Sequence, residues 1–264
     1  MVKEFDDTGY WTIVLGGSSG LGLASAMKLA EHGMNICVIH RNSRAEMSEI
    51  ESAFNKIRTL GVTFISFNVD VSRPESLDMV VEALKQQFHT TGSVRCLLHS
   101  IAKGNLKPLV GDASCLTDQD FSLTINNMAS SLVNWTSALH QSGLFAADAR
   151  VISFTSEGSS KAWKHYAAVS AAKAALEAIT RSIALEYAPY GIRANCIQAG
   201  VTDTASFRKI PGSEALVTHT LTRNPFRRMT TPQDIANAVY LLCKDEAAWI
   251  NGVILPVDGG EQIS

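Results

Sequence analysis

The sequence has few charged residues and no long hydrophobic run. Only 18% of its 264 residues are Asp, Glu, Lys or Arg, whereas globular chains average about 25%. The 23 basic and 25 acidic side chains give a formal charge of -2, which argues against binding nucleic acid through bulk positive charge. No apolar stretch approaches the ~20 residues of a membrane-spanning helix, and the first residues lack the apolar core of a signal peptide. We expect a soluble, cytoplasmic protein without nucleic acid or membrane as a partner.

Cysteine is also scarce, and its spacing is uninformative for metal binding. The five cysteines are scattered, odd in number and never in CxxC spacing, so reduced thiols fit better than disulfides or a zinc site. Cys37, Cys96 and Cys196 fall inside expected strands and are interpreted as core residues. No metal site is predicted.

Apolar, β-branched runs alternate with amphipathic stretches along the whole chain. Strands are expected at 11–15, 35–40, 63–68, 94–99, 150–155, 193–198 and 253–257. Helices are expected near 20–32, 43–60, 74–88, 117–140, 164–188 and 231–244. Because the strands are apolar throughout, both faces of the sheet should be covered. The pattern predicts a single α/β domain over 1–264, a Rossmann-type doubly wound parallel sheet of about seven strands.

The segment 201–231 fits this alternation least well. It contains Pro211-Gly212 and Asn224-Pro225 and two short helical stretches after the sixth strand. Ligands of open α/β sheets lie beyond the carboxyl ends of the strands. We therefore interpret 201–231 as a substrate flap, with a plain surface loop as the alternative.

A glycine-rich turn follows the first strand. Gly16, Gly20 and Gly22 form GxxxGxG between a strand and a helix, which lets the backbone approach a pyrophosphate at the helix N-terminus. A glycine turn without a ligand is the plainer alternative. The predicted cofactor contacts here are Gly16, Ser18, Ser19, Gly20, Leu21 and Gly22.

No carboxylate stands where the second strand ends. NAD-binding sites usually place one there for the ribose hydroxyls, but this chain has His40-Arg41-Asn42-Ser43-Arg44. A guanidinium pairs with phosphate in a fork geometry, so Arg41 and Arg44 favour NADPH (NADP+). The alternative is that they only solvate the start of the next helix.

With these motifs the sequence resembles the short-chain dehydrogenase/reductase family over essentially its whole length. Asp70-Val71 after the third strand, Asn126 in a mid-chain helix, a Tyr/Lys pair and Asp258-Gly259-Gly260 come after the glycine motif in family order. The resemblance implies that Asp70 and Val71 contact the adenine and that Asn126 supports a water-linked proton relay. A helix-distorting role for Asn126 is the alternative. The resemblance also implies a homotetramer or a homodimer.

The Tyr/Lys pair departs from the usual family spacing. Val169 stands four residues before Lys173, and the available phenol is Tyr166. Seven residues make two helical turns, so both groups share one face. This gap is similar to that of the enoyl-acyl-carrier-protein reductases in the family. The resemblance implies that Tyr166 binds the thioester carbonyl and Lys173 the nicotinamide ribose.

Two further strings resemble enoyl reductases. His99-Ser100-Ile101-Ala102 replaces the common Asn-Asn-Ala-Gly, and Ala199 replaces the usual proline before Gly200. His99 stands among cofactor contacts, which argues against proton transfer by its imidazole. The glycine turn is of the mainstream type, as in an NADPH-dependent subtype. The cofactor contacts that the resemblance implies here are Ser100, Ile101, Ala102, Gly200, Thr202 and Thr204.

Ser156 and a group of basic residues leave alternatives open. Ser156, ten residues before Tyr166, either binds substrate or caps a turn. An acidic acyl-carrier protein as partner would need a basic docking surface, whereas ordinary surface charge or subunit contacts are the alternative. The basic candidates are Arg208, Lys209, Arg223, Arg227 and Arg228, with Lys103 and Lys107 across the crevice.

Together these residues predict an NADPH-dependent enoyl-[acyl-carrier-protein] reductase of fatty-acid or related biosynthesis. Its substrate would be a trans-2-enoyl thioester carried by acyl-carrier protein or CoA. The alternatives are a 3-oxoacyl-carrier-protein reductase or another carbonyl reductase of the family and, less favoured, a non-catalytic NADPH sensor. The predicted catalytic residues are Tyr166, Lys173, Ser156 and Asn126.

Overall fold

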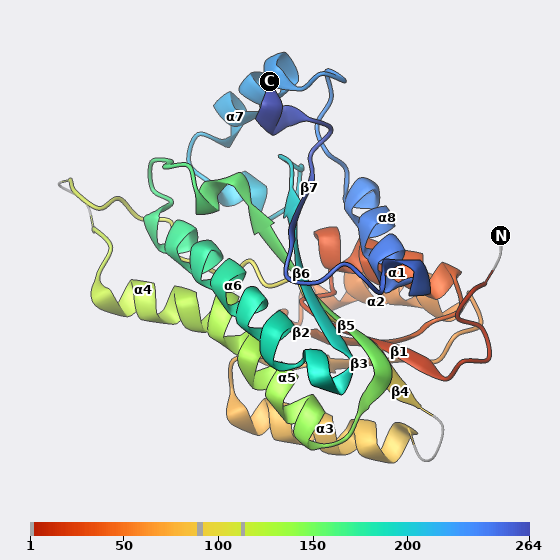
Figure 1. Ribbon diagram of the computed structural model, residues 1–264. Coiled ribbons are helices and arrows are strands. Elements are labelled where there is room, and N and C mark those ends of the chain that lie inside the picture. Colours follow the sequence, from red (N-terminus) through yellow and green to blue (C-terminus); the bar gives the residue numbers. More distant parts are fainter. Residues whose placement is uncertain (1–2, 89–91, 112–113) are drawn as a thin grey trace.

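The computed structural model describes residues 3–88, 92–111 and 114–264. Its centre is a parallel sheet of seven strands in the order β3-β2-β1-β4-β5-β6-β7 (Figure 1), so the Rossmann-type prediction is confirmed. All seven expected strands form. They are β1 (Tyr10–Leu15), β2 (Asn35–His40), β3 (Phe64–Asn68), β4 (Ser93–His99), β5 (Phe145–Ser156), β6 (Ile192–Ala199) and β7 (Ile254–Val257).

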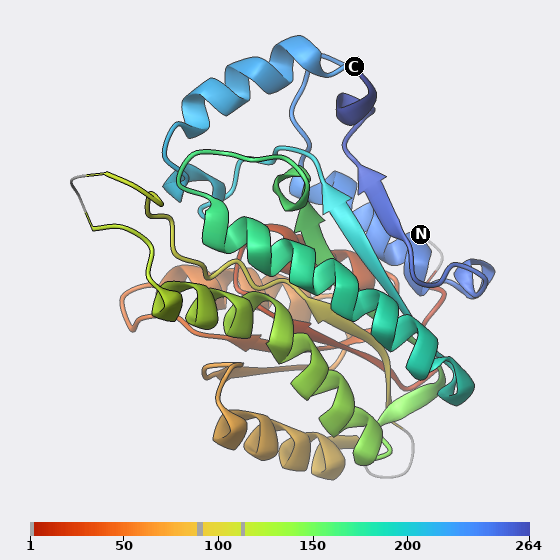
Figure 2. The same cartoon turned by 60° about the vertical axis from the view of Figure 1, so that its left-hand side comes forward.

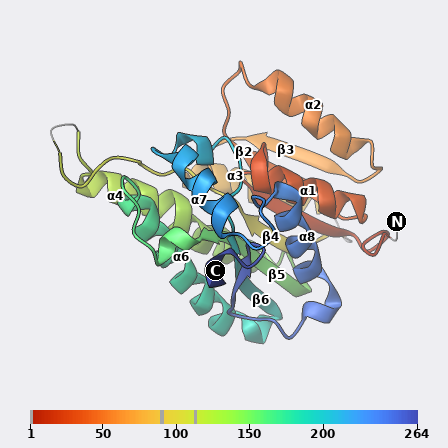
Figure 3. The same ribbon diagram turned by 90° about the horizontal axis from the view of Figure 1, so that it is seen from above.

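Helices cover both faces of the sheet, as the apolar strands require. One apolar core lies between the sheet and helices α3, α5 and α6, and the second lies under α1, α2 and α8 (Figure 3). Cys37, Cys96 and Cys196 are buried in these cores, as predicted. The helices are α1 (Gly20–Glu31), α2 (Met47–Arg58), α3 (Pro74–Phe88), α4 (Asp118–Ile125), α5 (Ser131–Gln141), α6 (Ala167–Glu186), α7 (Ser213–Arg223) and α8 (Pro232–Cys243).

The helix expected over 117–140 is interrupted. A capping box of Thr117 and Asp120 starts α4, but residues Asn126–Ser130 form a π-helical turn before α5 begins. The helix expected near 117–140 therefore forms, but a π-helical turn divides it into two α-helical parts. Such a turn inserts one residue into the helix and rotates the residues after it, so side-chain directions beyond Ile125 differ from those of a plain α-helix.

The segment 201–231 lies beyond the carboxyl ends of the strands. It forms a short 3-10 turn at Phe207–Lys209 and then α7, which are the two helical stretches expected. Figure 2 shows α7 above the arrowheads of β6 and β7. Among the described residues, no helix is long and apolar enough to span a bilayer.

Candidate active site

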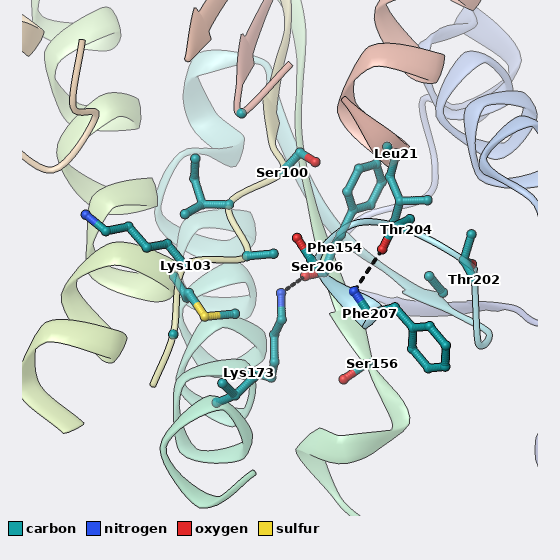
Figure 4. Close-up of a pocket in the computed structure, with 18 of the residues that line it drawn as sticks. Leu21, Ser100, Lys103, Phe154, Ser156, Lys173, Thr202, Thr204, Ser206 and Phe207 are labelled. Atoms are coloured by element: carbon teal, nitrogen blue, oxygen red, sulfur yellow. Dashed lines mark hydrogen bonds between the residues drawn. The ribbon is translucent and has the colours of Figure 1, made fainter. Parts of the chain in front are cut away.

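A cavity of about 410 Å³ opens at the carboxyl ends of the central strands. Its wall includes the turn after β1, the ends of β2, β4, β5 and β6, the start of α6 and part of 201–231 (Figure 4). The strand order reverses between β1 and β4, and this switch point is where open α/β sheets bind ligands.

The glycine turn forms the floor at β1. Gly16 has φ +87°, and a Cβ there would lie 2.4 Å from the Ser100 carbonyl oxygen. A Cβ on Gly22 would lie 2.3 Å from the Gly16 carbonyl oxygen. These contacts press the turn against β4 and leave the N-terminus of α1 beside the cavity, where its backbone N–H groups suit an anion.

Most predicted cofactor contacts line this cavity. Gly22 and Arg44 are the two that do not: Gly22 packs behind the turn, and Arg44 is exposed. The residues that line it are Gly16, Ser18, Ser19, Gly20, Leu21, Arg41, Asp70, Val71, Ser100, Ile101, Ala102, Lys173, Gly200, Thr202 and Thr204.

At the β2 and β3 end, an acidic side chain is enclosed by basic ones. Arg41 Nη1 lies 2.6 Å and Lys103 Nζ 3.4 Å from Asp70 Oδ2. Burial alone would raise the pKa of Asp70, but hydrogen bonds from Ser72 and the Lys103 charge outweigh it and hold this pKa at about 2. Asp70 is thus ionised, and Arg41 remains half-exposed at the cavity rim.

The predicted phenol lies at the other end of the cavity. Tyr166 precedes α6 and is only 6% exposed, and its hydroxyl lies 3.4 Å from Ser156 Oγ at the end of β5. Burial raises the pKa of Tyr166, although the Ser156 hydrogen bond opposes the effect. The phenol therefore stays protonated at neutral pH and can donate a hydrogen bond.

Lys173 lies two turns along the same helix. Its Nζ donates to the Phe154 carbonyl oxygen at 2.5 Å, a contact drawn in Figure 4. Burial lowers the pKa of this ammonium from 10.5 to about 8, while the charge of Glu177 opposes the change. The structure brings Tyr166, Lys173 and Ser156 together around one cavity.

Asn126 is not in that group. Its side chain is exposed and does not line the cavity, whereas the neighbouring Asn127 is 8% exposed and does. The one-residue insertion of the π-turn accounts for the difference. The prediction that Asn126 lies at the site is therefore wrong, because Asn127 is the asparagine that lines the cavity.

An apolar slot adjoins Tyr166, and sequence reasoning did not identify it. Gly104 allows this close packing, because a Cβ there would meet Val169 Cγ2 at 2.6 Å and Met128 Sδ at 3.0 Å. No sequence motif marks the slot, since its members come from four separate segments. They are Leu106, Met128, Trp163, Val169, Phe207 and Ile210.

The basic docking surface is largely neutralised within the chain. Arg208 makes a two-pronged contact with Asp203, with both N–O distances 2.7 Å. The other paired candidates are Arg223 with Glu157, Arg228 with Asp234, Lys103 with Asp70 and Lys107 with Asp120. Each of these five basic side chains therefore has a carboxylate partner within the chain, and docking of an acidic carrier at this surface stays a prediction.

Known proteins resemble the chain over nearly its full length. The family model described as enoyl-(acyl carrier protein) reductase matches residues 16–262. A probable 2,4-dienoyl-CoA reductase of Bacillus subtilis is 31% identical over 258 residues, covering 96% of each chain. The NADH enoyl-(acyl-carrier-protein) reductase of Aquifex aeolicus is 29% identical over 194 residues, covering 74% of this chain and 70% of the relative.

Solved structures agree in fold. The crystal structure of the Aquifex aeolicus enoyl-(acyl-carrier-protein) reductase (NADH) superposes with a TM-score of 0.82 at 25% identity and covers 97% of each chain. A short-chain dehydrogenase of Burkholderia cenocepacia in complex with NADP gives 0.82 at 24% identity, covering 97% of this chain and 98% of that one. The chain belongs to the enoyl-(acyl carrier protein) reductase family of short-chain dehydrogenases/reductases.

Proposed function

We propose that this protein is an NADPH-dependent enoyl-thioester reductase that converts a trans-2-enoyl thioester to the saturated acyl thioester. The observation that carries the proposal is the pair Tyr166 and Lys173, seven positions apart at the N-cap and in the second turn of α6, in the same cavity as the glycine turn. The apolar slot beside Tyr166 suits an acyl chain.

In this proposal the side chains hold and polarise the substrate. The bound cofactor supplies a hydride for the β-carbon of the enoyl group. The Tyr166 hydroxyl donates a hydrogen bond to the thioester oxygen, where negative charge develops as the hydride adds. A proton from solvent water then adds to the α-carbon and completes the saturated thioester. Lys173 binds the nicotinamide ribose, and its ammonium stabilises the negative charge on the oxygen. A protonated, buried phenol suits this role.

The preference for NADPH rests on the end of β2. His40, Arg41 and Asn42 line the cavity where β2 ends, and none of them is a carboxylate. The carboxylate nearby, Asp70 after β3, is paired with Arg41. Arg41 would exchange its bond to Asp70 for a fork contact with the 2′-phosphate. Because the relative in Aquifex aeolicus uses NADH by its name, both nicotinamides belong in every assay.

The acyl group of the proposed substrate is carried by acyl-carrier protein or by CoA. With Arg208 paired to Asp203, Lys209 and Arg227 are the basic side chains of 201–231 for which no ion pair is described. Reversing Arg208 and Lys209 to Glu should raise the KM for a carrier-linked enoyl substrate more than for a small thioester. Equal rises would exclude docking at this surface.

A carbonyl reductase is the second candidate, because Ser156 favours it. Its hydroxyl and that of Tyr166 lie 3.4 Å apart, so both can donate to one ketone oxygen. Crotonyl and acetoacetyl thioesters are assayed side by side with NADPH and NADH. Oxidation of NADPH with crotonyl thioester supports the proposal, and oxidation only with the ketone refutes it. Tight NADPH binding without turnover of either would indicate a sensor.

Exposed apolar side chains suggest self-association. Trp249 is 98% exposed and lies with Val253 next to the edge strand β7, and Leu185 on α6 is 78% exposed. A patch of exposed apolar side chains marks a contact with another protein surface, and a second copy of this chain would cover these residues. We propose a homotetramer. Light scattering would show a mass four times that of the chain, and a monomer would exclude this proposal.

A further inference from the structure

His99 at the end of β4 contacts the π-turn. The side chain is 1% exposed, and its Nε2 lies 2.8 Å from Ser131 Oγ at the start of α5. Ser131 is itself fully buried. A buried polar group needs a partner inside the protein, and this contact satisfies Ser131 and the Nε2 atom of His99. The Nδ1 atom of His99 is buried without a hydrogen-bond partner among the described residues.

The direction of the hydrogen bonds follows from the number of available protons. Ser131 Oγ lies 2.7 Å from the Asn127 carbonyl oxygen and donates its only hydrogen there. The 2.8 Å contact with His99 is then a donation from the Nε2–H of a neutral imidazole. Burial, with the Lys173 charge beside it, lowers the pKa of His99 to about 3. His99 thus keeps this form at every pH where the protein would work.

These bonds hold the irregular turn in place. The backbone N–H of Ser131 bonds to the Asn126 carbonyl oxygen five residues back, which is the π-helical pattern. The Asn127 carbonyl oxygen accepts a hydrogen bond from the Ser131 hydroxyl. The same turn leaves Asn126 exposed and Asn127 in the cavity wall, and it packs Met128 against Tyr166 and Val169.

We propose that His99 and Ser131 are positioning residues whose hydrogen bonds set the π-turn and thereby turn Asn127 into the active-site cavity. The inference rests on the proposed function in so far as Asn127 serves the reaction there. His99 transfers no proton in this account. His99 acts through its hydrogen bond to Ser131. It affects turnover because the position of the π-turn relative to Tyr166 depends on this bond.

The sharpest variant is Ser131→Ala, which removes one hydroxyl. Thr136→Val is its matched control, because Thr136 is also fully buried on α5 and its hydroxyl also donates to the carbonyl four residues back, at 2.8 Å from Leu132 O. We expect both variants to lower Tm by similar amounts. Ser131→Ala should lower kcat about 10- to 100-fold through misplacement of the site, with the NADPH dissociation constant within twofold, whereas Thr136→Val keeps kcat within twofold.

A second pair of variants tests the imidazole. His99→Gln keeps an N–H donor and should recover part of the activity that His99→Phe loses, while a merely space-filling role would favour Phe. The alkaline and acid limbs of the pH profile should not move in His99→Gln, since His99 does not titrate. If His99→Phe does not fold, Ser131→Ala with its control still decides the matter.

A crystal structure of Ser131→Ala with NADPH separates this inference from the proposed function. We expect the turn at 126–130 to relax and the Asn127 side chain to leave the cavity, whatever the substrate is. An unmoved Asn127, or a kcat of Ser131→Ala within twofold of wild type, overturns the inference. Failure of the proposed function would appear elsewhere, as an absence of enoyl reduction by the unaltered protein.

Discussion

Replacing the buried lysine of the candidate site should make the protein more stable and inactive. Lys173 is 8% exposed and has one described hydrogen bond, to the Phe154 carbonyl oxygen. Its ammonium has exchanged bulk water for an apolar surrounding, which disfavours the charged form. Methionine fills a similar volume without a charge, so Lys173→Met removes that penalty together with the ammonium proposed to bind the nicotinamide ribose.

The size of the effect follows from the pKa. This pKa falls from 10.5 to about 8 in the folded chain, and each unit corresponds to about 1.4 kcal/mol. Below pH 8 both folded and unfolded chains are protonated, and the folded state carries the whole penalty of about 3 kcal/mol. Loss of the charged hydrogen bond to Phe154 costs the variant about 1.5 kcal/mol. At pH 7 the variant should therefore be about 1.5 kcal/mol more stable.

The dependence on pH gives the test its sign. Between pH 8 and 10.5 the unfolded chain binds more protons at this lysine than the folded chain, so wild-type stability rises with pH. Urea unfolding of both proteins at several pH values from 7 to 10.5 measures the difference between their free energies of unfolding. The contributions of the other titrating groups cancel in this difference, because both proteins contain them. The advantage of Lys173→Met should shrink and then reverse. A variant less stable at pH 7, or a difference independent of pH, would refute the reasoning.

Three further predictions concern the site. Tyr166→Phe should lower kcat at least ~100-fold by removing the hydrogen bond to the substrate oxygen, while fluorescence titration shows NADPH affinity within twofold of wild type. Arg41→Ala should raise the KM for NADPH about tenfold or more and leave that for NADH unchanged, with the exposed Arg44→Ala as the inert control. Glu177→Gln removes a charge that raises the pKa of Lys173, so the alkaline limb of the kcat/KM profile should move to lower pH.

The strands and the glycine turn were predictable because local sequence determines them. Gly16 needs a positive φ and a close approach to β4, and both demands act on the residue itself. The apolar runs had to be covered on two faces, and they are. The seven-residue gap from Tyr166 to Lys173 likewise needed only helical geometry.

The place of the asparagine was not predictable in the same way. Asn126 and Asn127 are chemically identical neighbours, and a regular helix over 117–140 gives no reason to prefer the second. The choice depends on the π-turn, which depends in turn on contacts with β4, a strand about thirty residues earlier in the chain. The hydrophobic periodicity of the sequence places His99 in a strand, but it does not predict that the imidazole contacts the π-turn.

The charge of the segment 201–231 is a second property that the sequence alone does not predict. The sequence groups Arg208 and Lys209 as one basic pair, but in space Arg208 belongs to Asp203, five residues earlier, and Arg223 reaches Glu157 beyond β5. A chain with 23 basic and 25 acidic residues offers a carboxylate near most cations. The exposed pair of Arg208 and Asp203 adds little stability, yet pairs such as these cancel much of the field that an acidic partner would sense. The charge that an incoming anion meets is therefore decided by the pairing of these side chains in the fold, and docking has to be sought at the few cations for which no carboxylate partner is described.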